Sequence, residues 1–600
     1  METTKYIFIA LIGLLLISSC EEYLDKTPAA VITDREIFSS YSSFQGFIDP
    51  NYAEIMNYNT HYPCTTMNYG GEVYSYLEWA SGYYGNTGDY WTYLAGTNYS
   101  DPGPCLYISK GQGNSWPSTS TSTCGIWTGG WRGIRVCNMA IKKLPLLTEA
   151  TAEEKMLLEG QIYFFRAFFH QEIIAGFGGM PYVDSAFAAT DELKLPRLTY
   201  QACTDKIVAD YDRALDLLPE DWDQTTVGAA RLGANTGRLV KGMVLAYKQK
   251  VLLYAGSPLM NKFSGGDYSY NIEYCKKAAA AGWEMIKLAN KGLYSLVSFD
   301  NYYDNFSKRD GTIPWTTETI FQRMETRSGS TMANYLRQSS IPPRMGGSEA
   351  VEAVNQLYVD KFEMADGTRY NALYDSDNTK RWESRDPRFR KNIVVDRDVH
   401  GLVAATKVNL YTGTGSDKTQ AGKIALPYLH KKYWRAGVNA LDAGGYTNLR
   451  IINPLMRLAE VYLDYAEAVT AAYGPTGSAP GSSLTAVDAI NIIRARAEMP
   501  PVTADATGYA SFMDLVRNER NVELCFEGHY WFDIRRWHIA HLPENKEIVD
   551  LQFDQAWTAG SFKRVLFFTR VFEDPKHYWL PLPRKMCLLY KDMYQNPGWE

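Results

Sequence analysis

The sequence predicts a mainly α-helical protein that carries long irregular insertions and a few short β-strands. Residues 153–175 place Leu157, Ile162 and Phe169 at helical spacing and end at a Gly-rich turn. Six further segments show the same periodicity: residues 200–218, 237–255, 274–291, 454–472, 484–497 and 512–537. Small residues such as Gly160 recur inside them, as in tetratricopeptide-like helix pairs, which bury their faces by stacking on one another.

Irregular segments separate the predicted helices. They cover residues 51–131, 300–345, 366–445 and 543–575. Loops of this length are usually functional or disordered, and their aromatic content argues against disorder. The runs at 319–323 and 564–571 are rich in residues that favour strands, and they predict short β-strands within the insertions.

The first twenty residues have the features of an export leader. Lys5 precedes an uncharged run, residues 6–17, which is shorter than the roughly 20 residues that a membrane-spanning helix needs. The sequence Ile-Ser-Ser-Cys that ends at Cys20 resembles the lipobox of bacterial lipoproteins, in which the cysteine is lipidated and becomes the N-terminus. The alternatives are an ordinary signal peptide with an incidental cysteine, or a core helix. No other segment reaches 18 apolar residues, so we expect a protein that is anchored to a membrane and does not span it.

Charge and cysteine content bear on which ligands and which cross-links the protein can have. A formal charge of −6 over 600 residues provides no electrostatic basis for binding nucleic acid. One loop-like region of this exported chain holds four cysteines, for which we expect one or two disulfides with the pairing left open: Cys64, Cys105, Cys124 and Cys137. Four others are expected to be buried free thiols: Cys203, Cys275, Cys525 and Cys587. No CxxC motif or Cys/His cluster indicates a zinc site.

Residues 51–131 hold 12 Tyr and 5 Trp but no Phe, and only six charged residues. Tyr and Trp combine an apolar ring with a polar group, so they suit surfaces that bury apolar area and form hydrogen bonds. The composition predicts a binding surface for a neutral, hydroxyl-rich ligand such as a glycan. The candidate ligand-binding residues are Trp79, Tyr83, Tyr84, Tyr90 and Trp91, with a second patch at Tyr302, Tyr303 and Trp315. Two alternatives are rings that only hold loops onto the helices, and a protein–protein interface.

The sequence also offers weaker catalytic and metal-binding candidates. Glu460, Asp464 and Glu467 form a row on one predicted helix, but a glycosidase needs two carboxylates across a cleft. His538 and His541 are three residues apart without a third ligand near them in the sequence, so we expect no metal site. No Walker loop, G-x-S-x-G or H-E-x-x-H motif is present.

The charge-rich segment at residues 516–537 has its own interpretation. Its acidic and basic residues are spaced i, i+3 and i+4, and they alternate with large apolar residues. We interpret it as an internally paired helix that locks the C-terminal part of the protein, with no catalytic role.

Residues 517–537, RNERNVELCFEGHYWFDIRRW, resemble the signature R-x-E-R-x-x-E-L-x-F-E-G-x-R-x-F-D-x-R-R-W of the SusD/RagB family of outer-membrane nutrient-binding lipoproteins. The departure is Tyr530, where Arg is commoner. Four more landmarks of that family occur in order: SCEEYLDKTP, YFFRAFFHQEIIAGFGGMPYV, LMRLAEVYLDYAEAV and YWLPLPRKMCLLYKDMYQNPGW. The resemblance covers essentially the whole mature chain.

The resemblance implies a SusD-like fold with four tetratricopeptide-like helix pairs and long loops that carry the ligand surface. It implies a signal peptide at 1–19, an N-terminal region at 20–235 that includes the insertion 51–131, and a C-terminal region at 236–600, packed as one body. It further implies a protein without catalysis or cofactor. Such proteins sit on the exterior of the outer membrane, capture oligosaccharides, or peptides in the RagB branch, and pass them to a SusC-like TonB-dependent transporter. Glu21 and Glu22 after the cysteine resemble the signal for the outer face.

Overall fold

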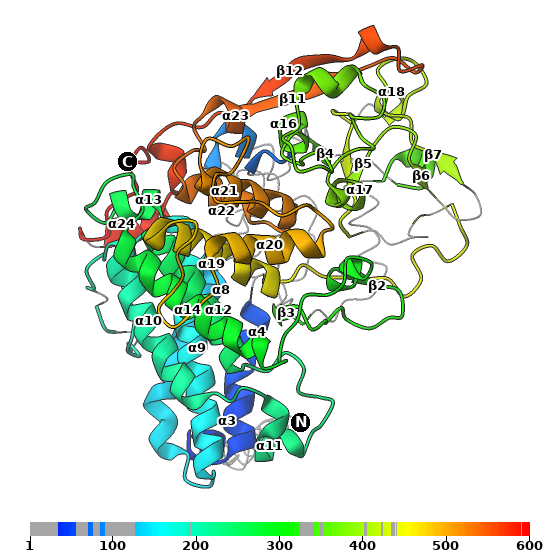
Figure 1. Ribbon diagram of the computed structural model, residues 1–600. Coiled ribbons are helices and arrows are strands. Elements are labelled where there is room, and N and C mark those ends of the chain that lie inside the picture. The colour runs from blue at the N-terminus through cyan, green and yellow to red at the C-terminus, as the bar shows by residue number, and fades with distance from the viewer. Residues whose placement is uncertain are drawn as a thin grey trace, which may run out of the picture.

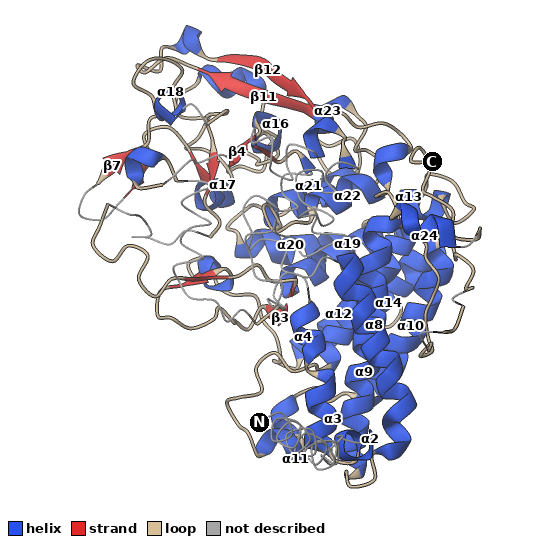
Figure 2. Cartoon of the chain, turned by 180° about the vertical axis from the view of Figure 1, so that it is seen from behind, coloured by secondary structure: helices blue, strands red, loops and turns tan. Residues whose placement is uncertain are grey.

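A bundle of long helices forms one side of the molecule, and the strands and irregular segments form the other (Figure 1). This computed structural model describes residues 34–55, 70–75, 85–90, 126–188, 190–192, 194–324, 341–347, 352–400, 405–421, 424–433, 439, 441–589 and 591–600. Seen from behind, most of the β-strands again lie on the side away from the long helices (Figure 2). The expectation of a mainly helical protein with short strands is confirmed.

The long helices pack in chain order, as stacked helix pairs do. Contacts join α8 to α9, α9 to α10, α10 to α12, α12 to α14 and α14 to α19, and α19 also packs on α20 and α21. Their bounds are α8 (Ile126–Lys143), α9 (Ala152–Phe177), α10 (Tyr200–Leu217), α12 (Lys241–Gly256), α14 (Ile272–Asn290), α19 (Leu458–Tyr473), α20 (Ala486–Arg496) and α21 (Phe512–Glu523). Each helix thus buries its apolar side against the next pair.

Local sequence explains both ends of the central helix α9. Thr151 accepts a hydrogen bond from the backbone N–H of Glu154, and the Glu154 carboxylate accepts one from the N–H of Thr151, which is a capping box. The helix ends at Gly178, whose φ of 78° suits a glycine. A side chain at Gly160 would approach Leu218 to 2.8 Å, so the small residue there permits close contact between α9 and the end of α10.

Three predicted helices differ from the structure, two at their first residue and one by a break in its middle. The helix predicted from residue 237 begins at Lys241, because Gly237 has a φ of +86°. The helix predicted from residue 454 begins at Leu458, after a short strand. The segment 512–537 is two helices, α21 and α22 (Tyr530–Arg536), because Phe526 and Gly528 between them both have positive φ.

The remaining helices are short and mostly lie in the insertions or at the ends of the bundle. They are α2 (Asp34–Phe38), α3 (Tyr41–Ile48), α4 (Pro50–Glu54), α11 (Thr226–Ala229), α13 (Pro258–Lys262), α16 (Gln356–Val359), α17 (Pro387–Asn392), α18 (Asp417–Ala421), α23 (Pro543–Lys546) and α24 (Arg584–Leu589).

The strands form small antiparallel sheets. The largest has the order β1-β4-β8-β5, from β1 (Val73–Ser75), β4 (Glu352–Val354), β8 (Leu429–His430) and β5 (Ile393–Val394). Two-stranded pairs join β2 (Ser307–Lys308) to β9 (Arg450–Ile451) and β6 (Val399–His400) to β7 (Thr406–Lys407).

Two further strand pairs position the regions discussed below. β3 (Thr319–Phe321), predicted at 319–323, pairs with β10 (Met456–Arg457), and the Phe321 ring packs on Phe164, Phe168 and Tyr247 of the bundle. β12 (Lys563–Thr569), predicted at 564–571, forms a hairpin with β11 (Glu547–Gln552). The first pair fastens the segment around residue 315 to the helices.

The expected disulfide region is only partly described. Cys64, Cys105 and Cys124 lie outside the described residues, and Cys137 is a buried free thiol that accepts a hydrogen bond from Asn51. Cys137 lies in α8 and is buried in the helical core, so the alternative with two disulfides is wrong, while one disulfide among the other three cysteines stays a prediction. As expected, the thiols of Cys203, Cys275 and Cys525 are free and buried, while Cys587 is free but only partly buried.

Candidate functional site

The predicted aromatic stretch falls mostly outside the described part of the chain. Trp79, Tyr83, Tyr84 and Trp91, like the lipidation candidate Cys20, lie outside the described residues and stay predictions. Tyr90 is described and is buried, with its ring stacked on Trp599 at 6.0 Å and edge-on to His577 at 5.3 Å. The prediction of Tyr90 as a ligand contact is wrong, because its ring helps to hold the C-terminal segment.

The second predicted patch is divided between core and surface. Tyr302 is buried, packs on Phe306 at 5.3 Å, and donates a 3.4 Å hydrogen bond to the backbone oxygen of Glu523. Tyr303 is partly buried and donates a 2.5 Å hydrogen bond to the backbone oxygen of Lys391. Neither ring lines any of the three hollows described below, and the contacts of both rings are those of packing.

Trp315 is the candidate that the structure places at an open hollow. The hollow has a volume of about 680 Å³, within the usual size range of small-ligand sites. Its walls come from the link between α10 and α12, from the segment after α14, and from the segment that runs from Trp315 into β3. Gly237, with its positive φ, lies against Trp315 and Met324, where a side chain would crowd the wall.

The hollow, which we call the Trp315 hollow, combines aromatic faces with many oxygen atoms. Tyr294 and Trp315 supply partly exposed rings, whereas Trp222 lines the wall as a buried side chain. Thr236, Thr316 and Thr317 supply hydroxyl groups. The charged and amide residues of the wall are Glu220, Asp221, Asp223, Asn235 and Arg238. Rings beside carboxylates, amides and hydroxyls are the groups that recognise the apolar faces and hydroxyl groups of a sugar.

Internal hydrogen bonds hold these polar groups in place. The Asn235 amide donates to the Asp223 carboxylate at 2.5 Å and to the Gly228 oxygen at 2.9 Å. Arg238 is fixed by two hydrogen bonds to Asp49, which lies between α3 and α4, the shorter at 2.6 Å. The wall is therefore largely formed before any ligand arrives.

Residues 220–238 form part of this wall and were not predicted as a site. Residues 220–238 place an isolated tryptophan, Trp222, between acidic residues in a link rich in Gly, Thr and Asn. Trp222 stands alone in its segment, and the other two rings of the wall, Tyr294 and Trp315, come from distant segments, so no local cluster of aromatic residues marks the hollow in the sequence.

A second hollow, of about 440 Å³, lies beside α8 and has mostly apolar walls that include Trp127, Trp131, Met586 and Met593. Its polar side chains already bond to the backbone: Arg135 to Phe187, Asn138 to Val183, and Asp191 to Ala188. We therefore favour the Trp315 hollow, because it offers more polar groups to a hydroxyl-rich ligand.

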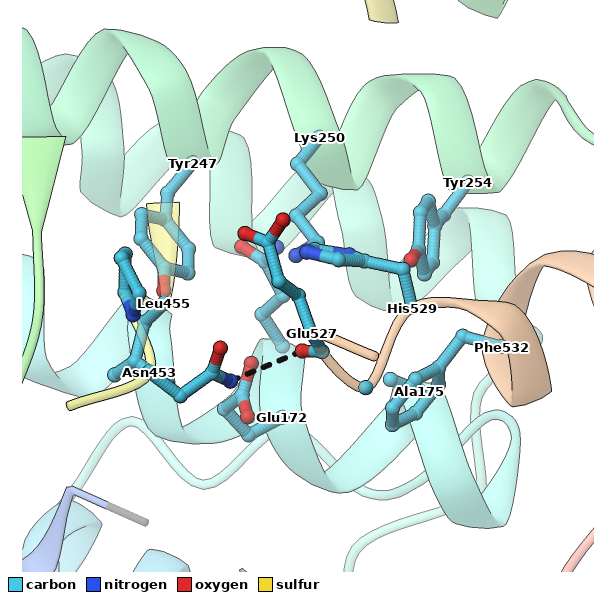
Figure 3. A pocket seen from close by; sticks show the side chains of 13 residues that line it. Glu172, Ala175, Tyr247, Lys250, Tyr254, Asn453, Leu455, Glu527, His529 and Phe532 are labelled. Carbon is cyan, nitrogen blue, oxygen red and sulfur yellow. Dashed lines mark hydrogen bonds between the residues drawn. The ribbon is translucent and has the colours of Figure 1, made fainter. Parts of the chain in front are cut away.

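A small internal cavity lies between α9, α12 and the turn before α22 (Figure 3). Lys250 points into it from α12, and the Asn453 amide donates a 3.0 Å hydrogen bond to the Glu527 backbone oxygen at its edge. Its volume of about 40 Å³ is enough for water but far too small for a sugar ring. We assign this cavity to the interior of the fold.

The predicted carboxylate row is part of a buried ion-pair cluster. Asp464 accepts a 2.5 Å hydrogen bond from Arg520, and Glu467 accepts two from Arg536, at 2.5 and 2.7 Å. Glu460 pairs with Lys250 at 3.0 Å. Burial alone would raise the pKa of Glu467, but Arg536 more than offsets it and lowers that pKa to about 2. Every member of the row has a basic partner inside the protein, as a structural role requires.

The family-like signature contributes to a second buried cluster, which we call the charge hub: Glu318, Arg388, Lys432, Arg457, Arg496, Glu519, Glu523 and Glu527. Arg457 donates to Glu318, Glu523 and Glu527 at 2.7–2.8 Å. Burial would raise the pKa of Glu523, but Arg496, Arg457 and Arg388 lower it well below its usual range. Glu519, Glu523 and Glu527 thus bond to other segments. Arg520 and Arg536 both pair with Asp533 inside the signature, so the predicted internal pairing is confirmed only in part.

Comparison with known proteins gives matches over most of the chain. A model described as "SusD family" matches residues 317–599, and one described as "Starch-binding associating with outer membrane" matches residues 23–234. A curated relative, SusD-like protein P2 of Formosa agariphila, is 22% identical over 545 residues, which cover 89% of this chain and 91% of the relative.

Solved structures show the same fold. A SusD-like protein of Bacteroides fragilis has a TM-score of 0.68 at 22% identity, over 94% of this chain and 99% of that one. A SusD-like carbohydrate binding protein of the same species has a TM-score of 0.63 at 19% identity, over 93% and 99% of the two chains. A SusD homologue of Bacteroides thetaiotaomicron has a TM-score of 0.60 at 18% identity, over 95% and 99%.

Proposed function

Because this chain belongs to the SusD/RagB family, we propose that it is a non-catalytic lipoprotein of the outer cell surface that binds oligosaccharides at the Trp315 hollow and passes them to a SusC-like TonB-dependent transporter. The observation that carries the ligand class is the grouping of the partly exposed rings of Tyr294 and Trp315 with carboxylate, amide and hydroxyl groups around one open volume. The carbohydrate-binding description of a structural relative supports the same class.

A screen of the soluble protein on a glycan array, with a peptide library in parallel, tests this proposal. A version without the first 20 residues retains every residue that the structure describes. We expect binding to one class of oligosaccharide and none to peptides. Binding to peptides alone would favour peptide capture, which the acidic residues Glu220, Asp221 and Asp223 would serve if the peptides were basic. Release of product from a chromogenic glycoside would contradict the non-catalytic assignment.

The proposed anchor is the lipid on Cys20. None of the helices in the described ranges combines the length and the apolar character that crossing a bilayer requires. Several acyl chains on one residue bind a membrane firmly, since each buried CH₂ contributes about 0.8 kcal/mol. A short leader after Cys20 would hold the ligand site near the transporter at a high effective concentration.

Replacing Cys20 with alanine should abolish acylation and remove the protein from the outer-membrane fraction, because the thiol that carries the lipid is lost. Metabolic labelling with a fatty acid, combined with membrane fractionation, measures both effects. Cys587→Ala is the matched control and should leave both unchanged. Acyl labelling that persists in the Cys20→Ala protein would show that the anchor has been misassigned.

A further inference from the structure

Two histidines and an aspartate meet at the end of the bundle near the C-terminus. His538 and His541 follow α22, which lies near α13 and the C-terminal end of the chain (Figure 1). Asp574 comes from the segment after β12. One potential ligand atom from each of the three side chains lies within 4.8 Å of the other two, and no other such group occurs among the described residues. The third ligand that the sequence did not show therefore comes from a segment beyond the β11–β12 hairpin.

His538 lies in the turn that ends α22. Its N–H donates to the Arg535 oxygen and the N–H of Ile539 donates to the Ile534 oxygen, both at 2.9 Å, which closes the end of α22. His538 occupies the position with positive φ, 57°, where glycine or asparagine is preferred. Residues other than glycine in this uncommon backbone conformation are found more often at functional sites.

Aromatic neighbours fix the direction of the two imidazole rings. The His538 ring is stacked on Tyr268 at 3.7 Å and on Tyr578 at 4.6 Å. Nε2 of His538 lies 3.0 Å from the Asp574 carboxylate, and Nδ1 of His541 lies 2.5 Å from the Tyr578 hydroxyl. A hydrogen bond at one ring nitrogen orients a histidine so that the other nitrogen, here Nε2 of His541, can coordinate a metal.

We propose that His538, His541 and Asp574 bind one divalent transition-metal ion of the Zn²⁺ type. Two imidazoles and one carboxylate suit Zn²⁺ and its neighbours better than Ca²⁺ or Mg²⁺, which prefer oxygen ligands alone. In a tetrahedral site with bonds of about 2.1 Å, ligand atoms lie about 3.4 Å apart. Ligand atoms as far apart as 4.8 Å would therefore have to approach one another by as much as about 1.4 Å, and water completes the coordination.

The ion would join the end of α22 to the segment that follows the hairpin. Residues 541 and 574 flank β11 and β12, so coordination closes the base of this hairpin against the helical bundle. This role is independent of glycan binding, because the site lies in a different part of the chain from the Trp315 hollow.

Calorimetric titration of ZnCl₂ into protein prepared without a histidine tag and treated with EDTA tests the proposal. We expect one ion per chain and a higher melting temperature in its presence. His538→Asn, His541→Gln and Asp574→Asn should each weaken binding at least tenfold. Asparagine tolerates the positive φ at position 538, so the first variant removes the ligand without straining the turn. Glu573→Gln, which removes the neighbouring exposed carboxylate, is the control and should bind as the parent does.

The melting temperature of each variant without metal shows whether it has folded. Absence of one-site binding in the parent, or unchanged affinity in folded His541→Gln protein, would overturn the proposal. Preference for Ca²⁺ over Zn²⁺ would also overturn it. The visible spectrum of the Co²⁺ complex provides a second readout, and loss of its bands in Asp574→Asn protein is the result expected.

Discussion

Replacing Arg457 with methionine should lower the free energy of unfolding by about 3–5 kcal/mol. Arg457 is 1% exposed and donates hydrogen bonds to three buried carboxylates, those of Glu318, Glu523 and Glu527. Methionine has a similar length but no charge, so these carboxylates would stay buried with less compensation. The remaining cations, Arg388, Arg496 and Lys432, each pair with only one or two of these three carboxylates.

Urea denaturation and calorimetry of the parent and variant measure this effect. Arg213→Met is the matched control, because Arg213 also pairs with a glutamate, Glu159, but with its side chain 48% exposed. An exposed pair contributes about 1 kcal/mol or less. If Arg457→Met proved as mild as Arg213→Met, the charge hub would not be what holds the C-terminal helices to the insertions.

Replacing Glu72 with glutamine should stabilise the protein at pH 8–9 by about 2–4 kcal/mol and have little effect near pH 5. Glu72 is 1% exposed, and burial raises its pKa to about 8, with Tyr358 and Lys432 lowering it only in part and Asp533 raising it. In the unfolded chain this carboxyl has its ordinary pKa of 4.5. Between these two values the unfolded state releases the proton and the folded state keeps it. Stability therefore falls as pH rises from about 4.5 to about 8, and glutamine removes that slope.

Thermal melting of the two proteins across pH 4.5–9 measures the difference. Glu284→Gln, on the outer side of α14, removes an exposed carboxylate and should follow the parent at every pH. Parallel melting curves for Glu72→Gln and the parent over the whole range would show that Glu72 is already ionised in the folded protein.

The helical core could be predicted from the sequence because its signals are local. The apolar spacing of α9, its capping Thr151 and the glycine at its end all lie within one short segment. The break between α21 and α22 was not predicted, because residues 524–529 continue the helical apolar pattern. Only Gly528 hints at a turn, and Phe526 has a positive φ that its residue type does not suggest.

The candidate sites depended on contacts between distant segments, and the sequence was a poorer guide to them. Tyr302 and Trp315 are both aromatic residues of one predicted loop. Tyr302, in η3 (Tyr302–Asn305), is buried against Phe306 and the backbone of Glu523, whereas Trp315 is only partly buried and lines a hollow just before β3. Likewise, Asp574 is far from His541 in the sequence and becomes its neighbour only when the β11–β12 hairpin closes.

The central claim is that the Trp315 hollow binds a sugar, and calorimetric titration of the oligosaccharide selected by the array tests it most directly. Trp315→Ala should weaken binding at least tenfold, about 1.4 kcal/mol or more, because it removes the exposed ring of the hollow. Trp283→Ala removes a partly buried tryptophan of α14 outside the hollow and should change the affinity less than twofold. Equal affinity in the parent and in folded Trp315→Ala protein would contradict the account.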